Sequence, residues 1–252
     1  MNDFFTWSVL LIVVTFFLAG FVKGVAGMGL PTMAMGILSV IMSPVSAASL
    51  LIIPSFVTNF WQLFSGPDFL GLIKRFWIMM IGIVVGTLAG SWLLTSANTP
   101  YTGVALGAAL IIYSVHGLFG KPLSVPLRLE RQLSPIIGIL TGLINGATGV
   151  FTLPAVPYIQ TLGLSKDDLI QALGLAFTVS TVALAAGLAK GGAFHVDNIS
   201  LSALAVAPAL FGMWVGGIVR KRISIKTFRL CFFIFISVIG IELASHPFLK
   251  FI

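Results

Sequence analysis

Lys23 is a charged residue inside an apolar stretch, where a positive charge could serve to bind an anion. The segment around it, residues 18–29, reads LAGFVKGVAGMG, and residues 140–151 read LTGLINGATGVF at an offset of 122 positions. The neutral amide of Asn145 is the counterpart of Lys23 in the second segment. A charge inside a membrane segment is costly and usually faces a cavity. The pattern favours a counter-charge for an anionic ligand, with snorkelling of Lys23 to the cytoplasmic surface as the alternative.

Both segments are rich in glycine, which indicates that a membrane helix is interrupted in each of them. The second piece of an interrupted helix offers free backbone N–H groups and a partial positive charge, and both attract anions. The expected binding residues are Lys23, Gly24, Gly27, Gly29, Asn145, Gly146, Thr148, Gly149 and Thr152, with Asn59 as a further contact. Local helix capping is the alternative for the two threonines, and an interhelical hydrogen bond is the alternative for Asn59, which matches Thr181 in the repeat.

Glu242 and His116 are candidates for proton coupling. They are related by an offset of 126 positions, and Glu242 is the acidic residue that falls within an expected span. A carboxyl group and an imidazole can both take up and release protons. Each residue lies in the last turns of its expected helix, so exposure at a membrane interface is the alternative.

The elements that position these residues are membrane helices. The chain is 58% hydrophobic and 8% charged, with a mean hydropathy of +1.10, which indicates an all-α polytopic membrane protein and excludes a water-soluble domain. A bilayer crossing needs about 20 apolar residues. The expected complete spans are 45–64, 76–95, 101–119, 169–190, 199–218 and 228–245, and the expected broken pairs are 4–22 with 31–43 and 135–145 with 150–163.

The chain divides into two similar halves. We expect an N-terminal repeat over 1–120, a cytoplasmic linker over 121–134 and a C-terminal inverted repeat over 135–252. Each half has a broken helix or hairpin followed by three spans. Beyond the glycine segments, Gly86 and Gly90 match Gly212 and Gly216 at an offset of 126. Inverted halves of this kind occur in many secondary transporters.

The basic residues predict the orientation of the chain. If each broken pair leaves and returns to one side, eleven basic residues share a face and only Lys190 and Lys250 lie on the other. The positive-inside rule then places the basic loops in the cytoplasm and both termini outside, in the inner (plasma) membrane. The eleven residues are Lys74, Arg75, Lys121, Arg128, Arg131, Lys166, Arg220, Lys221, Arg222, Lys226 and Arg229.

The sequence predicts no metal, no cofactor and no enzymatic activity. Cys231 is the single cysteine, the three histidines show no metal-ligand spacing, and there is no nucleotide-binding motif. The net charge of +7 is explained by orientation signals, so nucleic acid is not an expected partner. The expected partners are a small anion and the lipid bilayer, and a homodimer formed through the GxxxG pairs is a further candidate.

The motifs GFVKGVAGMGLP and GLINGATGVFTLPAVPYIQTLGLS resemble the sulfite exporter TauE/SafE family. This resemblance implies an integral inner-membrane permease that moves small sulfur-containing or carboxylated anions, typically outward. We expect a secondary transporter that exports sulfite, an organosulfonate or a related anion by alternating access at the paired breaks. The alternatives are an anion channel whose glycine turns form a filter and, third, a membrane-embedded enzyme.

Overall fold

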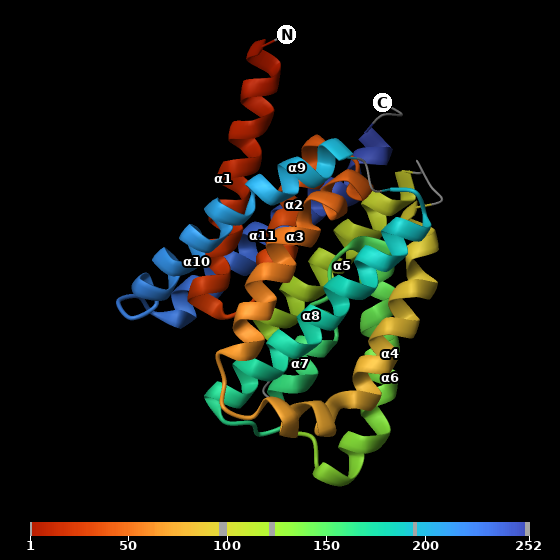
Figure 1. Ribbon diagram of the computed structural model, residues 1–252, viewed down its shortest axis with the longest axis vertical. Coiled ribbons are helices and arrows are strands. Elements are labelled where there is room, and N and C mark those ends of the chain that lie inside the picture. The colour runs from red at the N-terminus through yellow and green to blue at the C-terminus, as the bar shows by residue number, and fades with distance from the viewer. Residues whose placement is uncertain (1, 96–99, 121–123, 194–195, 250–252) are drawn as a thin grey trace.

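The computed structural model describes residues 2–95, 100–120, 124–193 and 196–249, and all regular structure within these ranges is helical (Figure 1). Lys121 and Lys250, two of the expected orientation charges, lie outside the described residues. The helices of the first half are α1 (Asn2–Ala26), α2 (Leu30–Ile41), α3 (Pro44–Phe64), α4 (Phe69–Thr95) and α5 (Pro100–Phe119). Those of the second half are α6 (Leu127–Thr148), α7 (Ala155–Gln160), α8 (Lys166–Lys190), α9 (Val196–Leu204), α10 (Val206–Val219) and α11 (Ile225–Leu249).

The described residues contain seven helical segments that are long and apolar enough to cross a membrane. They are Val9–Ala26, Pro44–Phe64, Phe69–Thr95, Tyr101–Phe119, Lys166–Lys190, Ile199–Val219 and Lys226–Ser245. All six expected complete spans fall within this set. The expectation of an all-α polytopic membrane protein is confirmed.

The first break lies later in the chain than we expected. Helix α1 continues past residue 22 to Ala26, because the N–H of Gly27 still donates to the Lys23 carbonyl at 2.7 Å. The helix ends where Gly27 adopts a φ of +75°, a left-handed conformation that favours glycine. Lys23 and Gly24 therefore lie in the last turns of a helix and not in the interruption itself.

The second broken pair also differs from its expected bounds. Helix α6 begins at Leu127, inside the expected linker, and ends at Thr148, before Gly149 with a φ of +73°. Asn145, Gly146 and Thr148 therefore belong to a helix. The returning piece is the six-residue helix α7, which is much shorter than the expected 150–163.

The expected span 199–218 consists of two helices that meet at Ala205. Pro208 has no backbone N–H to donate to the carbonyl of Leu204, so the hydrogen-bond ladder is interrupted there. Ala205 keeps helical dihedral angles, φ −69° and ψ −13°, and α10 continues the path of α9 (Figure 1).

Equivalent helices cross through equivalent glycines. A Cβ atom on Gly142 of α6 would overlap the carbonyl of Ile83 on α4, and one on Gly20 of α1 would overlap the carbonyl of Ala209 on α10. Gly20 matches Gly142 at the offset of 122, and Ile83 matches Ala209 at the offset of 126. Close helix approach in membranes relies on such small residues. The crossing of α1 with α10 therefore uses the same positions as that of α6 with α4.

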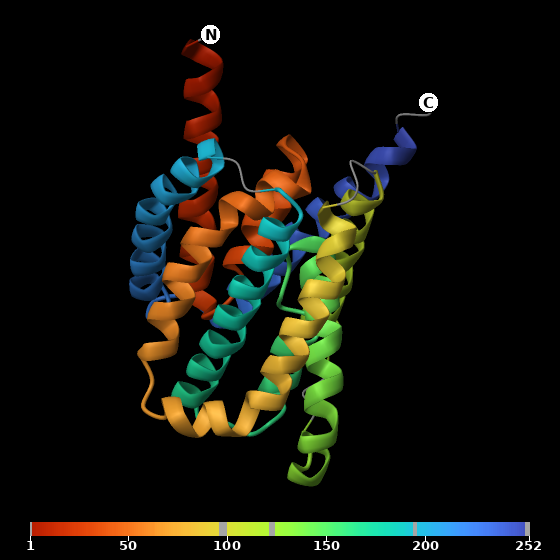
Figure 2. The same cartoon turned by 45° about the vertical axis from the view of Figure 1, so that its right-hand side comes forward.

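The partner glycines of these crossings are matched as well. Gly86 on α4 lies against the carbonyl of Ile139, and Gly212 on α10 lies against the carbonyl of Phe17. Corresponding helices run in opposite directions: α1 and α3 descend in Figures 1 and 2, whereas α6 and α8 rise. Helix α3 packs on α8 and α5 packs on α11, so each half contacts the other through corresponding elements.

Candidate functional site

The two interruptions meet in the interior of the protein. The hydroxyl groups of Thr32, in the first turn of α2, and Thr152, in the second break, lie 3.3 Å apart and both residues are buried. A Cβ atom on Gly149 would lie 3.0 Å from the Met35 side chain, so the second break also packs against α2. Residues about 120 positions apart are thereby brought into contact.

Gln62 connects the first break to the second half. Its Nε2 atom donates hydrogen bonds to the carbonyl oxygens of Gly27, at 3.0 Å, and Ile170, at 2.9 Å. The Gly27 carbonyl lies beyond the last intrahelical hydrogen bond of α1. A polar partner inside the protein is what such a backbone group requires in a membrane.

Lys23 lies inside the helix bundle and is only 3% exposed, so the snorkelling alternative does not hold in this structure. Its ammonium group donates to the Thr58 hydroxyl at 3.1 Å and to the side-chain oxygen of Asn59. The Asn59 amide nitrogen then donates to the hydroxyl of Thr181 on α8 at 3.2 Å. These bonds form a polar chain from α1 through α3 to α8.

Asn145 occupies the matching position in the second half. Its amide nitrogen donates to the Thr87 hydroxyl at 3.1 Å and to the carbonyl of Ser180 at 3.0 Å. Ser180 matches Thr58 at the offset of 122, so Lys23 and Asn145 contact equivalent positions on α3 and α8. The sequence pattern pairs Lys23 with Asn145 by their offset of 122, and the structure identifies the hydrogen-bond partners of each.

Several buried oxygen atoms near this network have no hydrogen-bond partner among the described residues. They include Ser55 Oγ and Thr141 Oγ1, each one turn before a network residue, together with Asn145 Oδ1 and Ser180 Oγ. Buried polar groups are nearly always satisfied. The three hydroxyl groups among these atoms can donate to a ligand or to water.

The charge of Lys23 has only neutral partners. Within the described parts of the chain, the one ion pair joins Arg75 to Glu130 and does not involve Lys23. An isolated buried charge is strongly unfavourable unless it is paired. An anion that enters this region would supply the missing partner.

A cavity of about 490 Å³ reaches both breaks. Gly120, directly after α5, and Val125, just before α6, line one part of it. Its wall includes Met28 from the first break and Pro154 from the second, with Tyr113, His116, Tyr158 and Arg229. The cavity therefore brings an arginine and a histidine together with one residue of each break.

The structure separates the predicted site glycines into two roles. Gly27, Gly29 and Gly149 have positive φ angles and form the breaks. Gly24 and Gly146 lie against α10 and α4 and allow close packing, so a ligand does not approach the backbone at these two positions in this conformation.

Thr148 has the local capping contacts that we considered for it. Its hydroxyl donates to the Ile144 carbonyl at 2.7 Å and accepts from the N–H of Val150 at 3.2 Å. Thr152 instead faces the other half through its contact with Thr32.

His116 and Glu242 lie at opposite ends of the packed pair α5 and α11. Glu242 is exposed on α11 one residue from Leu243, whose carbonyl approaches Gly103 near the start of α5. His116 lies near the end of α5 and lines the cavity. The structure brings His116 to the breaks but leaves Glu242 away from them.

Sequence reasoning missed Arg229, Tyr113 and Tyr158 as cavity residues. In the sequence analysis Arg229 served only to predict the orientation of the chain, because a basic residue near a loop is typical of the cytoplasmic side. Its guanidinium group lies 5.8 Å from the ring centre of Phe233, which directs it along α11 beside the cavity. Its position in the sequence could have identified it, because Arg229 lies near the start of a span, at the depth where His116 lies near the end of α5.

Comparison with known proteins agrees with this architecture. The sequence model described as "Sulfite exporter TauE/SafE" matches residues 12–243, which is nearly the whole chain. No curated protein and no solved structure matches the chain. Since the match covers both halves and both breaks, the chain belongs to the sulfite exporter TauE/SafE family of multi-pass membrane transporters.

Proposed function

We propose that the protein is a secondary transporter that exports a small anion: sulfite, an organosulfonate or a related sulfur-containing or carboxylate anion. The observation that carries the proposal is a cavity that reaches one residue of each break, Met28 and Pro154, and is lined by Arg229 and His116. The breaks themselves touch at the contact of Thr32 with Thr152. Family membership supports a transporter of this kind. The anion itself is inferred from the charges.

The cavity provides the first attraction for the substrate. Arg229 and His116 line its wall, and none of the described residues that line it is acidic. A cleft lined by one sign of charge concentrates ions of the opposite sign. Under the positive-inside orientation that we expect, the end of α5 and the start of α11, which both line the cavity, would lie on the cytoplasmic side, where an exporter receives its substrate.

Lys23 provides the second attraction, deeper in the protein. Lys23 lies about one helical turn before Gly27 and Met28 in the chain, and Met28 lines the cavity. A substrate that passes the break would meet a buried positive charge whose present partners, Thr58 and Asn59, are neutral. Exchange of these partners for the anion would couple binding to a rearrangement of α1 against α3.

Alternating access would follow from the inverted relation of the halves, 1–120 and 135–252. Equivalent glycine crossings and opposite helix directions support this relation. A motion that closes the cavity at one end of the molecule has a symmetry-related motion that opens the other end. The outward-open state would be lined by the equivalents of the present cavity residues.

The direct test is flux of radiolabelled sulfite, sulfate, a sulfonate and a carboxylate in proteoliposomes that contain the purified protein. We expect saturable flux of at least one anion, and we expect Lys23→Met to lower it about tenfold or more, since a lost charge contact of 1.4 kcal/mol corresponds to a factor of ten. Lys166→Met, which removes an exposed charge at the start of α8, is the matched control and should transport normally.

Three other outcomes would contradict parts of this proposal. Flux that grows linearly with concentration and shows no counter-transport would favour the channel. Equal flux in wild type and Lys23→Met would remove Lys23 from the substrate path. Chemical conversion of an added acid or lipid by the purified chain would revive the enzyme alternative.

A further inference from the structure

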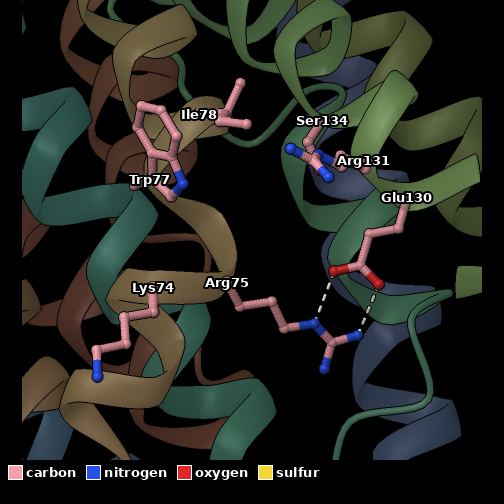
Figure 3. A pocket seen from close by; sticks show the side chains of 7 residues that line it. All are labelled: Lys74, Arg75, Trp77, Ile78, Glu130, Arg131 and Ser134. Carbon is pink, nitrogen blue, oxygen red and sulfur yellow. Dashed lines mark hydrogen bonds and ion pairs between the residues drawn. The ribbon is translucent and has the colours of Figure 1, made fainter.

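A second cavity lies apart from the breaks, between the first turns of α4 and α6. Its volume is about 390 Å³ (Figure 3). The residues that line it are Lys74, Arg75, Trp77, Ile78, Glu130, Arg131 and Ser134. Figure 3 shows the α4 residues on one side of the opening and the α6 residues on the other.

One of the three basic residues is neutralised within the protein. Arg75 binds Glu130 through two parallel hydrogen bonds, Nε to Oε1 at 2.6 Å and the terminal nitrogen to Oε2 at 2.8 Å. Both carboxylate oxygens are therefore occupied. Among the described residues, Lys74 and Arg131 form no ion pair. The cavity keeps two uncompensated positive charges on opposite sides.

The apolar surface beside the cavity indicates what kind of anion fits. On α4 the exposed side chains that follow at helical spacing are Trp77, Ile81, Val84, Val85 and Leu88. On α6, which packs against α4, they are Ile136, Ile139, Leu140 and Leu143. Along both helices, a strip of exposed apolar side chains thus follows directly after Lys74 and Arg131. Such a surface is complementary to a molecule with an anionic head and an apolar chain.

The depth of the cavity agrees with a bilayer interface. Lys74 and Arg131 lie within the first two turns of α4 and α6, and the uninterrupted apolar run of α4 starts directly after Arg75. Trp77 is 53% exposed at the same level, and tryptophan is enriched where the headgroups meet hydrocarbon. Basic residues at this level attract anionic lipids.

We propose that the cavity formed by Lys74 and Arg131 binds the phosphate headgroup of an anionic phospholipid, whose acyl chain lies along the exposed strip of α4 and α6. The Arg75–Glu130 pair forms its floor and positions the two helices. This site is independent of the transported anion. It also reaches α7, because the Tyr158 hydroxyl donates to the Glu130 carbonyl at 3.0 Å and contacts Ser134 at 2.9 Å.

The test is lipid retention measured by native mass spectrometry of the purified protein with phosphatidylglycerol and with phosphatidylcholine. We expect bound phosphatidylglycerol in wild type and at least a fivefold loss in Lys74→Gln/Arg131→Gln. The control Arg128→Gln/Lys166→Gln removes the same charge from exposed positions in the first turns of α6 and α8 and should retain the lipid.

A third arm adds inorganic phosphate to distinguish a free ion from a lipid headgroup. The lipid assignment predicts that millimolar phosphate leaves phosphatidylglycerol bound, because the acyl contact is absent from the free ion. Equal retention in the double variant and wild type, equal loss in the control variant, or displacement by free phosphate would each overturn the proposal. Unfolding of the double variant in detergent would show as a changed helical circular dichroism signal, and Lys74→Gln alone would then carry the test.

Discussion

The ammonium group of Lys23 on α1 donates a hydrogen bond to the side-chain oxygen of Asn59 on α3, in the interior of the membrane-spanning bundle. The amide nitrogen of Asn59 in turn donates a hydrogen bond to the hydroxyl of Thr181 in the other half. A single amide thus links the charged residue of the first half to the second half. The bond gives the buried ammonium group a neutral acceptor, and among the described residues Lys23 has no ionic partner.

Replacement of Asn59 should therefore destabilise the protein. Asn59→Ala removes the acceptor of a charged donor and leaves Lys23 and Thr181 each short of a partner. Hydrogen bonds to charged groups contribute about 1.5–3 kcal/mol, so we expect a loss of about 2 kcal/mol. The measurement is unfolding in detergent followed by circular dichroism. Gln132→Ala, which truncates an exposed amide on α6, should change stability by less than about 0.5 kcal/mol.

The glycine crossings predict matched losses in the two halves. Gly20→Ala and Gly142→Ala each place a methyl group against a carbonyl of the facing helix, so both should destabilise the protein by about 1–3 kcal/mol. Gly217→Ala is the control, because a Cβ atom there meets nothing within 4 Å. Alanine is the better helix former, so this variant should be neutral or slightly more stable. A loss in Gly20→Ala without one in Gly142→Ala would count against the repeat.

Arg229 should affect capture of the substrate more than its movement. Arg229→Gln removes a positive charge from the cavity wall, and we expect the KM for the anion to rise about threefold to tenfold with a smaller change in maximal flux. The difference should shrink at high salt, because screening weakens long-range attraction. Arg222→Gln, on the exposed turn before α11, is the matched control. An unchanged KM at low salt would exclude the cavity as the substrate entrance.

The contact between Thr32 and Thr152 allows the two breaks to be joined covalently. Their hydroxyl oxygens are 3.3 Å apart, so a cysteine pair at these positions should form a disulfide on oxidation. The exposed Cys231 is first replaced by serine. If transport requires the breaks to separate, oxidation should abolish flux and reduction should restore it. Undiminished flux through the fully oxidised protein would contradict movement at this contact.

Much of the fold was predictable because its causes are local. A span is recognised by about 20 apolar residues, and a left-handed turn is recognised by glycine. The breaks nevertheless lie later than expected, since one glycine at position 24 does not end a helix whose backbone hydrogen bonds continue to Gly27. The interruption at Ala205 was missed because Pro208 falls within an otherwise continuous apolar run.

The candidate site was only partly predictable. Lys23 and Asn145 were identified by their offset of 122, but their roles depend on Thr58, Asn59 and Ser180, which other helices supply. The two glycines next to them, Gly24 and Gly146, were expected to admit a ligand. In the structure they lie against neighbouring helices, because a glycine that permits close approach serves a ligand and a helix equally well.

The sequence by itself determined that the protein is a helical membrane protein, and it predicted two glycine-rich breaks, with Lys23 and Asn145 at positions that match at an offset of 122. Only the tertiary structure decided that α3 meets α8, that the two breaks touch, and that His116 and Arg229 share one cavity. The physical reason is that lipid and protein interior are equally apolar. In a chain of this composition, hydrophobicity shows which segments enter the membrane but does not show which face of each helix contacts another helix.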